Sequence, residues 1–179
     1  MVVVRVYRSL GETEESGSAG LLLQRLRTVC PALTRLQQET CYYILVDGKD
    51  NEAQAQDVMQ VLGKEAACQL WGLLGDPWLP DSGLHTTTQL QPSHDSQVLV
   101  EIGPRLTFTT AWSTNAVSIC QAAGLTGVRR LERAHRYLVT ASAPFSLQDR
   151  QKVGQTCIFH FTLITNIKMC GISLLHIDY

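Results

Sequence analysis

Hydrophobic and polar positions alternate in three stretches of the chain, and each stretch predicts a β-strand. The first runs from Val2 to Ser9 and is rich in valine. The second is the aromatic and β-branched run "ETCYYILVDG", residues 39–48, which closes with an Asp-Gly turn. In the third, alternation begins at Val98 and is expected to continue through Leu106 and Phe108, beyond a corner at Pro104.

Apolar residues recur at helical spacing in three further segments. Leucines and a valine mark a helix over 21–29, with Ser18 as its cap and Cys30-Pro31 as its stop. Residues 51–74 predict one broken helix or two short ones, because Gly63 interrupts the pattern. Residues 113–123 predict a helix closed by Gly124, and residues 75–97 show no period and indicate a long loop. The order strand, helix, strand indicates layers of sheet and helix.

One segment, residues 128–140, fits two interpretations. Val128, Leu131 and Leu138 suit the stripe of a helix, whereas Tyr137 and Val139 suit a strand. The local pattern leaves both open.

Charge and cysteine usage narrow the class of protein only slightly. The chain has fifteen lysines and arginines and sixteen acidic residues, so no overall basic field attracts nucleic acid. The six cysteines form no C-x-x-C pair and the N-terminus lacks a cleavable leader pattern, which predicts reduced thiols in a cytoplasmic protein. The uncharged stretch before Lys168 is shorter than the roughly 20 residues that cross a bilayer, so we expect no membrane anchor.

The polar cluster Ser113-Thr114-Asn115 is the first candidate site. It precedes an apolar helix, where free backbone N–H groups can hold a phosphate or carboxylate. An ordinary helix cap uses the same residue types and is the simpler interpretation. Arg105 could clamp an oxyanion, although an arginine beside Gly-Pro also serves as a corner residue.

No motif of an autonomous enzyme is present. The chain contains no G-x-S-x-G, H-E-x-x-H or Walker-type sequence, and its five histidines never fall at metal-ligand spacing, so we expect no catalytic residue and no metal site. Four arginines could contact RNA but lack interleaved aromatics, and a solvated or interface strand explains them more simply. They are Arg129, Arg130, Arg133 and Arg136.

One longer stretch of sequence is more specific than any of these features alone. The stretch "LVEIGPRLTFTTAWSTNAVSICQAAGLTGVRRLERAHRYLV" combines Gly-Pro-Arg, the threonines ending in Ser-Thr-Asn, a helix to Gly-Leu, and Arg-Leu-Glu-Arg followed by Arg-Tyr. It resembles the N-terminal domain of the large, single-chain phosphoribosylformylglycinamidine synthases, also called formylglycinamide ribonucleotide amidotransferases. The resemblance covers about residues 2–140.

The resemblance implies a fold and a role. The fold would be α+β, with a mixed or antiparallel sheet, helices on one side, and a pseudo-twofold βα-containing repeat similar to the small S subunit of the split enzyme. Residues 128–140 would then be a strand. The role would be that of a scaffold and coupling domain in purine biosynthesis, not catalytic by itself.

The chemistry would lie in parts that this chain does not contain. A synthetase region would bind ATP, Mg²⁺ and the ribonucleotide, and a glutaminase domain would release ammonia, so this chain would hold no cofactor of its own. Those regions would be its partners, with no nucleic acid or membrane involved. Arg105, Ser113, Thr114 and Asn115 become candidates for contacts with them. The alternative is a free-standing α+β module that binds an anion or nucleotide at Ser113 or contacts RNA.

The sequence therefore predicts three parts: a domain over 1–141, the start of a linker over 142–152, and an aberrant hydrophobic tail over 153–179. The tail resembles nothing in the family, and we expect it to derive from a retained intron or an incomplete gene model and to pack loosely. Its run "CIFHFTLI" has high β-propensity without charge or proline, which is a pattern typical of aggregation.

Overall fold

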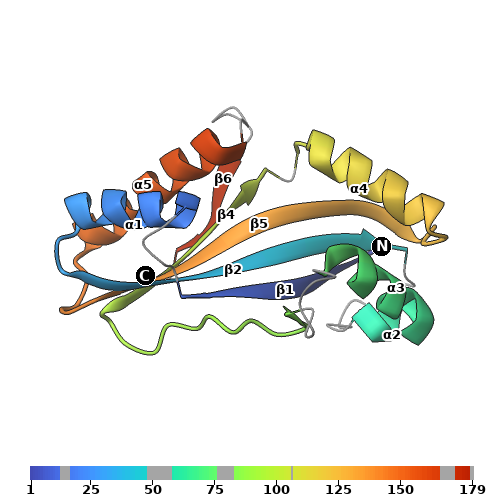
Figure 1. Ribbon diagram of the computed structural model, residues 1–179, viewed down its shortest axis with the longest axis horizontal. Coiled ribbons are helices and arrows are strands. Elements are labelled where there is room, and N and C mark those ends of the chain that lie inside the picture. Colours follow the sequence, from blue (N-terminus) through green and yellow to red (C-terminus); the bar gives the residue numbers. More distant parts are fainter. Residues whose placement is uncertain (13–16, 48–57, 76–82, 106, 166–171, 178–179) are drawn as a thin grey trace. The chain divides into compact units, whose positions relative to one another are not determined.

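The structure is a computed structural model that describes residues 1–12, 17–47, 58–75, 83–105, 107–165 and 172–177. Its strands form one sheet in the order β3-β1-β2-β5-β4-β6, and β4 pairs antiparallel with both β5 and β6 (Figure 1). The elements are β1 (Val2–Glu12), α1 (Gly17–Val29), β2 (Leu33–Val46), α2 (Val58–Leu62), α3 (Lys64–Leu74), β3 (Leu84–His85), β4 (Gln97–Pro104), α4 (Ala111–Ala122), β5 (Val128–Ala141), α5 (Leu147–Thr165) and β6 (Ile172–Ile177). The predicted α+β class and an antiparallel sheet are confirmed.

The chain divides into two compact units. The first comprises residues 1–9, 40–89 and 106–134, and the second comprises residues 10–39, 90–105 and 135–179. The long strands β2 and β5 each contribute residues to both.

The core of the first unit lies on one face of its strands. Val2 and Val4 are buried while Val3 between them is 55% exposed, as alternation in a half-buried strand requires. Helices α2, α3 and α4 supply the other side of this core through Val58, Leu70 and Cys120.

The core of the second unit is built in the same way. Val98, Val100 and Ile102 of β4 project into it at every second position. Leucines of α1 and residues of α5 cover them, so helices also line one face here.

The ambiguous segment 128–140 is a strand, β5. Its pattern does not alternate cleanly because both faces are covered at its C-terminal end. Tyr137 and Val139 enter the core under the helices, whereas Leu138 packs with Leu90 and Leu99 in a separate small cluster. Burial on both faces removes the period of two by which a strand is recognised.

Several predicted boundaries are corrected. Strand β2 begins at Leu33, six residues before the predicted start at 39. Strand β4 ends at Pro104, and Phe108 is 42% exposed outside any strand, so the continuation beyond the corner was wrong. Proline has no N–H with which to extend the ladder. Residues 48–57, 76–82 and 106 carry other predictions but lie outside the described residues.

The predicted breaks at glycines are confirmed. Gly63 separates α2 from α3 with a φ of 81°, and Gly124 follows α4 with a φ of 87°. Both lie in the left-handed region that glycine adopts without a steric penalty.

The structure corrects the expectation of loose packing for the start of the predicted tail. The proposed boundary at 152/153 lies inside α5, and Val153, Cys157 and Phe161 recur at intervals of four residues and are at most 1% exposed. This spacing places them on the helix stripe that faces the core. Residues 153–161 therefore pack tightly, while the division into domain, linker and tail as a whole stays a prediction.

Candidate functional site

The start of α4 is the region that the sequence singled out, and its cap is Thr110. Helix α4 begins at Ala111, two residues before the predicted start, and the Thr110 hydroxyl accepts a hydrogen bond of 2.9 Å from the Ser113 backbone N–H. Ser113 therefore lies inside the first turn and is 1% exposed. The sequence missed Thr110 because neighbouring Ser, Thr and Asn residues offer several equivalent caps.

A carboxylate from β5 holds this cap in place. Glu132 is buried and accepts hydrogen bonds from the Thr110 N–H at 3.2 Å and from the Thr110 hydroxyl at 2.8 Å. Arg130 donates to the same carboxylate at 3.1 Å and also to the Phe108 carbonyl. A negative charge at a helix N-terminus is favourable because it faces the positive end of the helix dipole. Glu132 thus places a negative charge beside the N-terminus of α4 through its hydrogen bonds to Thr110.

This geometry predicts that Thr110 contributes measurably to the free energy of unfolding. We expect Thr110→Val to lower the free energy of unfolding by about 1–2 kcal/mol, because the cap and one donor to a buried carboxylate are lost together. The matched control is Thr114→Val, since the Thr114 hydroxyl donates only to the Thr110 carbonyl at 3.3 Å. Urea unfolding of both variants measures the difference, and equal stability would contradict the assigned role.

The four predicted site residues do not form one cluster within either unit. Ser113, Thr114 and Asn115 belong to the first unit, whereas Arg105 follows β4 in the second. Arg105, Thr114 and Asn115 are exposed and Ser113 is buried. Their roles as contacts stay predictions.

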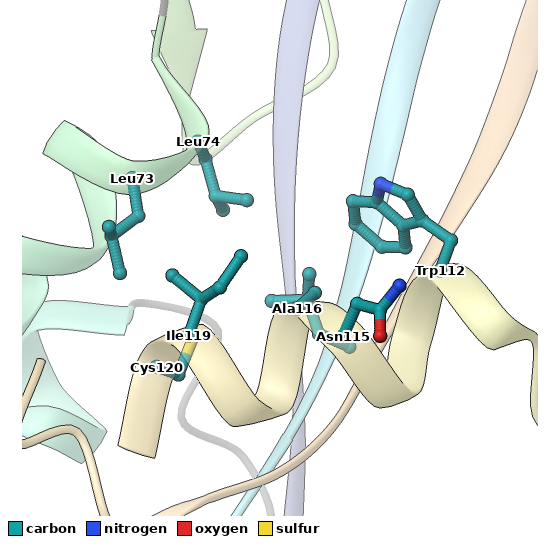
Figure 2. A pocket seen from close by; sticks show the side chains of 8 residues that line it. Leu73, Leu74, Trp112, Asn115, Ala116, Ile119 and Cys120 are labelled. Carbon is teal, nitrogen blue, oxygen red and sulfur yellow. The ribbon is translucent and has the colours of Figure 1, made fainter. Parts of the chain in front are cut away.

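Asn115 borders an apolar groove of about 260 Å³ in the first unit, which we call the α3/α4 groove. In Figure 2, Leu73 and Leu74 of α3 point toward Ile119 of α4, while Trp112 and Asn115 lie nearer the N-terminal end of α4. The groove is lined by Leu73, Leu74, Trp112, Asn115, Ala116, Ile119, Cys120 and Leu131. The sequence did not indicate it, because α3 and α4 are far apart in the chain and only folding brings them together.

The four arginines of β5 all interact with other residues of the chain. Arg129 pairs with Asp47, and its hydrogen bonds hold the pKa of that carboxyl below its usual range. Arg130 pairs with Glu132, and the Arg133 guanidinium lies 5.4 Å from the centre of the Trp112 ring. Their clustering in the sequence therefore reflects several separate contacts.

Arg136 lies in a buried ion network of the second unit. Its Nη1 donates to Glu39 at 2.5 Å, and its Nε lies 3.1 Å from the Glu101 carboxylate. All three side chains are buried, and Glu39 is only 1% exposed. Such a network is costly to disrupt because each remaining charge would be left unpaired away from water.

His160 of α5 is a core histidine of the second unit, as expected for a histidine outside any metal-ligand spacing. It is 2% exposed, and its Nδ1 has no hydrogen-bond partner among the described residues. Burial lowers the pKa of His160 below 6.5, and the positive charge of Arg25 lowers it further.

This burial predicts how stability changes with pH. The folded state takes up the His160 proton at a lower pH than the unfolded chain does, so stability is lost as the pH falls below about 6.5 toward the folded pKa. We expect His160→Leu to weaken this dependence in unfolding experiments between pH 7.5 and 5, with the same change at exposed His94 as the control. Equal pH slopes for wild type and His160→Leu would disprove the assignment.

Four of the five described cysteines are buried. Cys30, Cys41, Cys120 and Cys157 are free and buried, while Cys68 is free and exposed. Burial raises the pKa of Cys157 to about 12, which keeps that thiol protonated and unreactive. Cys170 lies outside the described residues.

In the described part of the chain, the His, Cys, Asp and Glu side chains form no group that could bind a metal ion. None of its helices combines the length and apolar character needed to span a bilayer.

Comparisons with known proteins agree with the sequence signature. Residues 39–160 match the family model described as formylglycinamide ribonucleotide amidotransferase N-terminal. A phosphoribosylformylglycinamidine synthase of Drosophila melanogaster is 34% identical over 140 residues, which is 78% of this chain and 10% of the relative. The human protein of that name is 33% identical over 134 residues, 75% of this chain and 9% of the relative.

A shorter match has a higher sequence identity. A probable chloroplastic or mitochondrial phosphoribosylformylglycinamidine synthase of Arabidopsis thaliana is 68% identical over 47 residues, 26% of this chain and 3% of the relative. The chain thus spans at most about a tenth of the length of these curated relatives.

Proposed function

Since the chain belongs to the family of formylglycinamide ribonucleotide amidotransferase N-terminal domains, we propose that it acts as the structural and coupling domain of a phosphoribosylformylglycinamidine synthase. In this proposal the ATP- and glutamine-dependent chemistry of purine biosynthesis takes place in the other domains of the enzyme. ATP and Mg²⁺ bind in the synthetase region, and this domain holds that region and the glutaminase together. The chain itself is noncatalytic.

One observation carries the proposal: the family match over residues 39–160 includes parts of both compact units. Arg136 supports a scaffold role, because its buried ion network joins β5 to Glu39 of β2 and Glu101 of β4. The one-sided arrangement of helices in each unit is in keeping with the S-subunit-like repeat that we propose for the fold.

The test is functional replacement. The Drosophila relative, with its aligned N-terminal region deleted, is mixed with the purified 179-residue chain, and glutamine-dependent synthase activity is measured. We expect the chain to restore activity that the deletion abolishes. Supplying ammonia in place of glutamine separates an effect on coupling from one on the synthetase. No restoration with either nitrogen source would contradict the proposal.

Arg105, Thr114 and Asn115 are exposed and are proposed to contact the other domains. Ser113 is buried in the first turn of α4, where its backbone N–H donates to the Thr110 hydroxyl. In the reconstituted enzyme, Arg105→Ala and Asn115→Ala are expected to raise the ratio of glutamate released to product formed above that of the unsubstituted chain. The isosteric change Thr34→Val, on the second unit, is the control. An unchanged ratio in both alanine variants would remove the proposed contact role.

A further inference from the structure

We infer that the α3/α4 groove is a docking site for an apolar segment that carries a carboxylate and comes from another domain of the same synthase. This inference rests on the proposed function and extends it by assigning the surface and the chemistry of its partner.

The apolar side chains of the groove are the first support. Leu73 is 41% exposed and Ile119 is 55% exposed, although both point into the groove from facing helices (Figure 2). Contiguous exposed aliphatic side chains are typical of interaction sites, because removing apolar surface from water lowers the free energy. The floor of the groove, formed in part by Cys120 and Leu131, is buried and continuous with the core of the first unit.

The polar and charged groups at the groove indicate the chemistry of the segment that would bind there. No charged residue is among the described residues that line the groove, and Asn115 supplies its amide, so a bound segment would be apolar with one hydrogen-bonding group. Trp112 lies at the same groove, and the Arg133 guanidinium stacks over its ring at 5.4 Å. Among the described residues Arg133 has this ring as its contact and no carboxylate. A partner segment that ends in a carboxylate near Trp112 would complement that cation.

Charge also favours another domain, and not a second copy of this chain, as the occupant of the groove. A twofold pairing would place groove against groove and bring the Arg133 cations of both copies to an interface whose lining contains no carboxylate. The matched region makes up only 9–10% of the curated relatives of 33–34% identity. In an enzyme of that length, a segment of the same polypeptide would meet the groove at a high effective concentration.

The experiment measures binding of the whole 179-residue chain to the Drosophila relative that lacks its aligned N-terminal region. Ile119→Lys and Leu73→Lys place a charge in the groove at exposed positions that should tolerate it, and Arg133→Glu reverses the cation. We expect each to weaken binding by about tenfold or more. Leu21→Lys, at a 46% exposed leucine of α1 in the second unit, is the matched control and should bind like the unsubstituted chain.

The outcomes separate the two proposals. Binding that is unaffected by the groove substitutions overturns the docking site and leaves the scaffold role intact. Equal weakening by Leu21→Lys overturns it too, since the effect would then not be specific to the groove. If the substitutions abolish self-association of the chain while binding to the truncated enzyme persists, the occupant is a second copy. No binding by the unsubstituted chain overturns both proposals. Unfolding curves of each variant verify that the chain is folded.

Discussion

Phe161→Ala is expected to lower the free energy of unfolding by about 3–5 kcal/mol. Phe161 is 1% exposed in the core of the second unit, and its ring meets His135 edge-on with centroids 5.3 Å apart. Removing it leaves a cavity in a core that is closely packed, and the lost contacts are not recovered by relaxation.

The control lies two residues away in the same helix. Phe159 is 53% exposed, and the Arg25 guanidinium stacks on it, 5.4 Å from its ring centre. Phe159→Ala should cost about 0.5–1 kcal/mol. Urea denaturation of both variants decides whether this part of α5 belongs to the folded core. Equal small effects would mean that residues 153–161 pack as loosely as their sequence suggested.

Arg136→Leu is the second change with a large expected effect, about 3–5 kcal/mol of lost stability. The substitution leaves Glu39 and Glu101 buried in the second unit without the guanidinium that lies between them. Two carboxylates without their cation repel each other and are poorly solvated, so part of the loss should be recovered by the further change Glu39→Gln.

The matched control for this prediction is Arg129→Leu. Its partner Asp47 is also on the surface, and the two side chains are about half exposed, so water replaces the lost contact. Little change is expected in its unfolding midpoint. A similar loss in both variants, or no recovery with Glu39→Gln, would contradict the importance assigned to the buried network.

Local patterns predicted most elements because they depend on neighbours in the sequence. Alternating valines revealed β1, the leucine stripe revealed α1, and Gly63 marked the break between α2 and α3. The errors arise where the choice is not local. Thr110 and Ser113 are both good caps, and the choice between them depends on Glu132, which lies on β5.

The sequence did not predict the α3/α4 groove. Asn115 borders it, but the apolar wall opposite comes from Leu73 and Leu74 on a helix about forty residues earlier. No spacing in the sequence predicts which two helices will face each other. Arg105 and the Ser113-Thr114-Asn115 cluster stand close together in the sequence but belong to different units.

The sequence alone determined the family, the α+β class, the reduced state of the buried cysteines and most of the helices and strands, since each depends on composition, short-range period or a contiguous signature. The tertiary structure decided the rest. It buries Phe161 and His160 in a region that the sequence describes only as hydrophobic, and it provides Arg136 with carboxylates from β2 and β4. These outcomes depend on contacts between residues far apart in the chain, and such contacts are formed only when the sheet and its helices pack together.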